Sequence, residues 1–82
     1  MAMFGDKRAD KVIEAGAKAL QGGAYFFTPK LEWPTGTPSN STHAEEWARI
    51  IHELEANGWA LTQWQVVKDR DEFVAFPLFR RR

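Results

Sequence analysis

The spacing of apolar and polar positions predicts two helices and three strands, in the order helix, strand, helix, strand, strand. Over residues 6–21, apolar side chains recur every three or four positions between charged ones, which is typical of an amphipathic helix. The glycine pair at 22–23 predicts its end, because glycine adopts left-handed backbone conformations. Only Val12, Ile13 and Leu20 give this stripe bulk, so the helix is expected either to pack closely on an aromatic surface or to be loosely attached.

The second helix is predicted from Thr42 to Asn57. Thr42 and Glu45 have the spacing of a capping box, in which each side chain satisfies a free backbone donor of the first turn. Gly58 follows Asn57 and supplies the stop signal. The stripe expected to be buried consists of Ala44, Trp47, Ile50, Ile51 and Leu54.

Three segments have strand character, at 24–33, 59–67 and 72–79, and the polar residues 68–71 read as a hairpin turn between the last two. Pro29 cannot donate a ladder hydrogen bond, so it marks an edge, a bulge or a break.

These elements predict an α+β fold with α-β-α-β-β order: a small, three-stranded, mostly antiparallel sheet with the second helix packed on one face. A single domain spans 1–82, with 1–22 as an N-terminal helix that is an accessory element or a cover, and 24–79 as a β-α-β-β core. The turn-rich stretch 34–41 is expected to be a mobile loop. Strand order stays open, because Pro77 indicates an edge or bulged strand while its apolar neighbours indicate a central one.

Both faces of the predicted hairpin are apolar. In its first strand Trp59 and Leu61 share one side, and Trp64 and Val66 share the other. In its second strand the alternating sets are Phe73, Ala75 and Phe79 against Val74, Phe76 and Leu78. A sheet with two apolar faces is expected to be covered on both. The second helix covers one, and the other requires the first helix, a second copy of the chain or a ligand.

Composition narrows the possible functions. The 82 residues include four tryptophans and six phenylalanines but no cysteine, so aromatic packing rather than disulfides is expected to stabilise the fold. The missing cysteines favour a cytoplasmic setting, and no segment has the length and apolarity of a membrane span. The formal net charge is zero, which indicates no overall attraction to nucleic acid or membrane.

Candidate chemistry is sparse. His43 and His52 lie nine residues apart on one helix and so point in opposite directions, which excludes a shared metal ion within one chain. The glutamates at 45–55 belong to the polar side of that helix, where solvated carboxylates lack the apolar surroundings that general acid chemistry needs. Ser39 and Ser41 have no partner base in the sequence pattern. We therefore expect no enzyme activity, metal or cofactor.

The run Gly58-Trp59-Ala60-Leu61, the amphipathic helix before it and the end Phe79-Arg80-Arg81 resemble a group of small bacterial and phage domains of unknown function. Their hallmark is a helix running into Glu-Gly-Trp-Glu-Leu, then two strands and a basic end. The resemblance covers residues 42–81 and departs at Asn57 and Ala60, where acidic residues are usual. It implies a β-α-β-β core and a bacterial or phage accessory protein, and it brings no catalytic residues.

The favoured function is a non-catalytic binding or assembly module that works through protein–protein contacts, because the aromatic surface exceeds what one small chain can cover. The expected partner is a second copy, as a homodimer, or another protein of the cell or host. The interface candidates are Tyr25, Trp33, Trp64, Phe76 and Leu78.

The alternative is a module for single-stranded nucleic acid, which would combine stacked aromatics with basic side chains. Its candidate cations are Lys30, Lys68, Arg70, Arg80, Arg81 and Arg82. The zero net charge and the acidic second helix make this the less favoured hypothesis.

Overall fold

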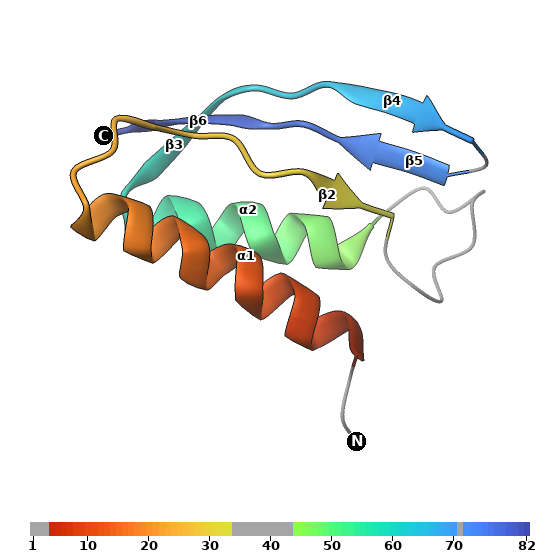
Figure 1. Ribbon diagram of the computed structural model, residues 1–82, viewed down its shortest axis with the longest axis horizontal. Coiled ribbons are helices and arrows are strands. Elements are labelled where there is room, and N and C mark those ends of the chain that lie inside the picture. The colour runs from red at the N-terminus through yellow and green to blue at the C-terminus, as the bar shows by residue number, and fades with distance from the viewer. Residues whose placement is uncertain (1–3, 34–43, 71) are drawn as a thin grey trace.

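A computed structural model of the chain describes residues 4–33, 44–70 and 72–82 (Figure 1). The loop predicted at 34–41 lies outside these residues. The elements are α1 (Phe4–Gln21), β1 (Phe26–Phe27), β2 (Leu31–Glu32), α2 (Glu45–Asn57), β3 (Trp59–Gln63), β4 (Val66–Asp69), β5 (Glu72–Ala75) and β6 (Leu78–Arg81). The α+β class and the order of helices and strand segments are those predicted.

Each predicted strand is divided in two, so the described chain forms two small antiparallel sheets, ordered β1-β6-β3 and β2-β5-β4. They lie end to end in Figure 1. Two interruptions fall around Pro29 and Pro77, where no backbone N–H is available to the ladder. The third, between β3 and β4, follows a register shift between Leu61 and Gln63 within β3. The Phe76 N–H donates to the Gln65 carbonyl across the gap at 2.7 Å.

The last stretch of chain is the centre of both sheets. β6 lies between β1 and β3, with Phe79 opposite both Phe27 and Leu61, and β5 lies between β2 and β4. Both sequence signals around Pro77 were therefore informative, since the strand is central and is also broken at the proline.

Two glycines end the helices as predicted. After α1, Gly23 has φ 86°, and the N–H groups of Gly23 and Ala24 donate to the Leu20 and Ala19 carbonyls at 3.1 and 3.0 Å, which is a Schellman motif. After α2, Gly58 has φ 124° and its N–H donates to the Glu55 carbonyl at 3.2 Å. Both glycines permit the left-handed turn that leads from helix to strand.

The start of α2 differs from the prediction. The helix begins at Glu45, and Ala44 holds the N-cap position without a side-chain hydrogen bond. Thr42, the residue of the predicted capping box that would have been the N-cap, lies outside the described residues. The predicted apolar stripe of the helix is confirmed, with Trp47, Ile50 and Leu54 buried.

Both helices lie on the same face of the sheets and pack against each other (Figure 1). The buried core between the layers contains Ala9, Leu31, Trp47, Ile50, Leu54, Trp59, Ala75 and Phe79. At Gly16 the absence of a Cβ lets α1 approach the Leu54 and Trp59 side chains, and the Trp59 Nε1–H donates to the Gly16 carbonyl at 3.0 Å. The first helix thus packs closely on aromatic residues, and neither α1 nor α2 covers the opposite face of the sheets.

Candidate functional site

An aromatic cluster fills the space between α2 and the β2–β5–β4 sheet. Trp47 meets the rings of Trp33 and Trp64 edge to face, with centroids 5.2 and 5.5 Å apart. Phe73 lies 5.8 Å from Trp33 and extends the cluster. Trp33 and Trp64, two of the predicted interface residues, therefore lie on the helical side.

The prediction that Trp64 and Val66 lie on the face opposite Trp59 is wrong. It assumed unbroken alternation, whereas the register shift between Leu61 and Gln63 changes the direction in which the following side chains point. Trp64 contacts Trp47 on α2, and Val66 lies opposite the buried Ala75. A bulge of one residue has thus moved a large aromatic ring from one side of the sheet to the other.

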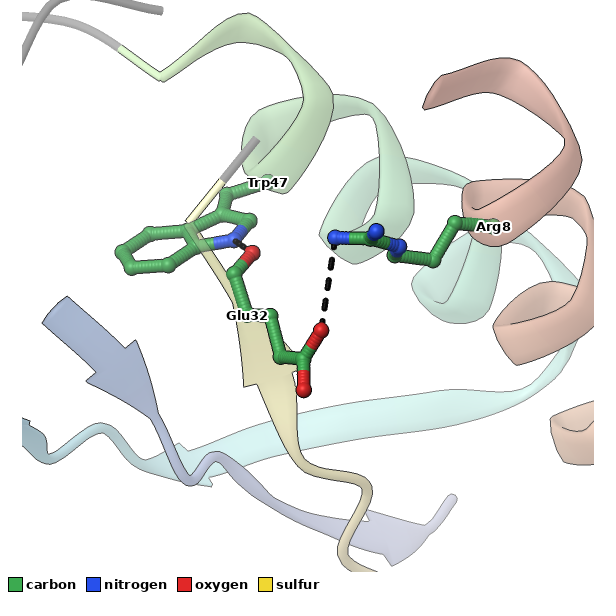
Figure 2. A network of polar contacts seen from close by, with 3 residues as sticks. All are labelled: Arg8, Glu32 and Trp47. Carbon is green, nitrogen blue, oxygen red and sulfur yellow. Dashed lines mark hydrogen bonds and ion pairs between the residues drawn. The ribbon is translucent and has the colours of Figure 1, made fainter. Parts of the chain in front are cut away.

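A small cleft lies beside this cluster, between α1, β2 and α2. Figure 2 shows the Trp47 Nε1–H donating to the Glu32 carbonyl at 2.9 Å, and the Glu32 carboxylate 3.4 Å from the Arg8 guanidinium. The cleft has a volume of about 190 Å³, and its apolar lining includes Val12, Leu31 and Ile50. Pockets for drug-sized ligands and cofactors usually exceed roughly 300 Å³, so this cleft is too small for such a molecule.

The described part of the chain offers little for metal or acid–base chemistry. It contains no group of three or more His, Asp or Glu residues that can hold a metal ion, and its buried residues include no polar or charged side chain. His52 is exposed, and His43 lies outside the described residues. Within the same ranges, no helix is long and apolar enough to cross a membrane.

The face of the sheets turned away from the helices carries a regular row of side chains from the central strand, which we call the outer strip. Along β5, β6 and the residues between them, side chains alternate between the two faces. The side chains that face the helices are those of Phe73, Ala75, Pro77, Phe79 and Arg81. The outer strip consists of the others: Glu72, Val74, Phe76, Leu78 and Arg80. The alternation of the hydrophobic residues is the one predicted from the sequence.

The flanking strands widen this surface, and the charged residues on it make its two ends different. Phe26 and Ala60 lie opposite Arg80 at one end, while Val67 lies opposite Val74 near the other. Phe26 is 60% exposed and Phe76 41%, whereas Val74 is only 4% exposed. Asp69 lies opposite Glu72 at the far end. Along the outer strip itself, this face is therefore apolar in the middle, acidic at one end and basic at the other, while the exposed residues Gln63 and Glu32 lie opposite Leu78 and Val74 on the flanking strands.

The five predicted interface residues do not converge on one surface. Phe76 and Leu78 belong to the outer strip, whereas Trp33 and Trp64 belong to the aromatic cluster. Tyr25 is 71% exposed just before β1, where its carbonyl accepts the Arg81 N–H at 2.8 Å. Sequence reasoning did not select Glu72 as a site residue, although its place in the alternation from 72 to 80 was a signal that could have identified it.

The six basic residues predicted for nucleic-acid binding also do not lie on one surface. Arg81 points inward, where its Nε and Nη2 donate to the Ala24 and Leu20 carbonyls at 2.8 Å each, and its guanidinium lies 6.0 Å from the Trp59 ring centre. Lys68 lies opposite the inward-facing Phe73, so it belongs to the helical side. Arg80 is the cation on the outer strip. The others are placed as follows: Lys30 beside the cleft, Arg70 in the β4–β5 turn with φ 61°, and Arg82 exposed after β6.

Comparison of the chain with protein-family models, with curated proteins and with solved structures finds no match in any of the three. The resemblance of residues 42–81 to small bacterial and phage domains stays a prediction from the sequence.

Proposed function

We propose that this chain is a non-catalytic assembly module that self-associates through the outer face of its sheets, with a second copy of itself as the partner. The observation that carries the proposal is a face with exposed Phe26, Val67 and Phe76 that neither helix covers. Exposed apolar residues that gather on one face of a small domain are characteristic of protein interfaces.

The free energy available for self-association can be estimated from the exposed surface of Phe26 and Phe76. A phenylalanine offers about 150–250 Å² of surface. The exposed fractions of 60% for Phe26 and 41% for Phe76 leave about 200 Å² of that surface in water per copy. At about 25 cal/mol per Å², covering this area stabilises a complex by about 5 kcal/mol per copy before the entropic cost of association.

The alternative function, binding of single-stranded nucleic acid, has less support. Phe26 and Phe76 offer rings for stacking, and Arg80 lies directly opposite Phe26 at the basic end. However, Asp69 and Glu72 share the same face and would repel phosphates, while Arg81 and Lys68 belong to the other side of the sheet. A basic groove along the aromatic residues, which such proteins use, is therefore not formed by these residues.

We expect the replacement Phe76→Asp to abolish self-association, because it puts a charge at the centre of the apolar surface. Sedimentation equilibrium from about 1 to 200 µM should show a concentration-dependent dimer for the wild type and a dimer at least about 100-fold weaker for the variant. Tyr25→Asp is the matched control, since Tyr25 is exposed but is not part of the outer strip, and it should leave the dimer intact.

Near-UV circular dichroism of both variants checks that the fold is retained. A wild type that stays monomeric over the whole concentration range, or a Phe76→Asp variant that dimerises as well as the wild type, would overturn the proposal. Salt-sensitive quenching of tryptophan fluorescence by an oligonucleotide, in a chain that remains monomeric, would favour the nucleic-acid alternative instead.

A further inference from the structure

We propose that the two copies lie face to face in antiparallel order, with a twofold axis at Phe76, so that Glu72 of each copy meets Arg80 of the other. This inference rests on the proposed function and specifies how that surface recognises its partner. The observation behind it is the arrangement of charge and bulk along the outer strip.

The outer strip is self-complementary about its centre. Phe76 is its middle residue, Val74 and Leu78 lie on either side, and Glu72 and Arg80 form the two ends. When a second strip is laid over the first in reverse direction, Phe76 meets Phe76, Leu78 lies over the position of Val74, which its own chain already covers, and each Glu72 meets Arg80. A twofold axis that lies midway between the outer faces of the two copies, at a right angle to their strands, relates the two strips in this way. Both copies then use the same patch of surface in the interface.

The parallel arrangement is disfavoured by like charges. An axis along the strand would place Glu72 over Glu72 and Arg80 over Arg80. Asp69 lies directly opposite Glu72, so the acidic ends would bring four carboxylates together. Within the described part of the chain the ion pairs of Arg8 with Glu32 and of Arg49 with Asp10 lie elsewhere, and Glu72 and Arg80 have no ion-pair partner. Both are therefore available to a second copy.

The dimensions allow these contacts. Glu72 and Arg80 are each four residues from Phe76, about 13 Å along a strand. Packed sheets usually cross at about 30°, which displaces facing ends by about 7 Å, and the side chains of glutamate and arginine can span this offset across sheets about 10 Å apart. The strip and its two neighbours cover about 26 by 14 Å, or roughly 360 Å² per copy, which is less than the roughly 800 Å² per partner of a standard specific interface. We therefore expect a weak dimer with a micromolar dissociation constant.

A charge-swap cycle tests the arrangement. Glu72→Arg and Arg80→Glu each place like charges together at both ends of the dimer, and each should raise the dissociation constant about tenfold or more at low salt. The double variant Glu72→Arg/Arg80→Glu restores both pairs in exchanged positions, and it should return within about threefold of the wild type. The matched control is Glu14→Arg, which makes the same change in net charge on the exposed side of α1 and should have no effect.

The outcomes of sedimentation separate this inference from the proposed function. Loss of the dimer in both single variants with recovery in the double variant supports the antiparallel arrangement. If the dissociation constant is unchanged in all three charge variants but the dimer is lost in the Phe76→Asp variant, the antiparallel arrangement is overturned and the proposed function stands. A chain that is monomeric under all conditions overturns both.

Discussion

Replacement of Trp59 by alanine is expected to lower the free energy of unfolding by about 3–5 kcal/mol, the range for loss of a large buried aromatic side chain. Trp59 is 0% exposed, and its ring is stacked on Phe27 with centroids 5.7 Å apart. Its Nε1–H also fastens α1 to the sheet through the Gly16 carbonyl. A chain of this length is stable by roughly 4–12 kcal/mol, so the loss is a large part of the total.

Urea denaturation at low protein concentration measures this effect without a contribution from association. Trp59→Phe is the matched control, since it keeps an apolar ring and removes the hydrogen bond; it should cost about 1–2 kcal/mol. A loss below about 1 kcal/mol for Trp59→Ala would show that α1 and the sheet do not depend on this residue.

The second large effect is expected for Trp47→Ala, again about 3–5 kcal/mol. Trp47 is 7% exposed and connects α2 to the edge segment β2 through its hydrogen bond to the Glu32 carbonyl. It also supports the rings of Trp33 and Trp64. Its removal should therefore loosen β2 and Trp64 as well as lower global stability.

Hydrogen exchange distinguishes these two consequences, because the amides of β2 should lose protection before those of β6. The control is Trp64→Ala, which removes a partner from the same cluster at a position that is already 40% exposed, and it should cost only about 1–2 kcal/mol. Equal losses for the two variants would mean that Trp47 is not the centre of the cluster.

Much of this fold follows from local sequence signals. Gly23 and Gly58 mark the helix ends because a left-handed turn requires a residue without a Cβ. The row from Glu72 to Arg80 could be assigned to two faces because alternation has a period of two, and inward-facing Pro77 and the apolar residues around it keep that period through the break.

Other features depend on tertiary structure that the sequence pattern does not encode locally. The bulge before Trp64 adds one residue to its strand, and a pattern of period two cannot show where such a shift occurs. Similarly, α1 was an open alternative as the cover of the second face. Its place beside α2 depends on the close approach at Gly16, which only the packed structure shows. These two features decide which aromatic residues remain on the outer face.

Crosslinking of single-cysteine variants tests the central claim most directly, because the natural chain contains no cysteine. On the proposed axis, the thiol introduced by Phe76→Cys faces the same thiol of the second copy, so a short bis-maleimide should join two chains rapidly. In a dimer of the Glu72→Cys variant the two thiols lie about 26 Å apart, so this variant alone should stay uncrosslinked. When it is mixed with the Arg80→Cys variant, the thiol at position 72 of one copy faces the thiol at position 80 of the other, and the two chains should be crosslinked. Rapid self-coupling at position 72, or none at position 76 at concentrations where sedimentation shows that the Phe76→Cys variant is itself dimeric, would contradict the account.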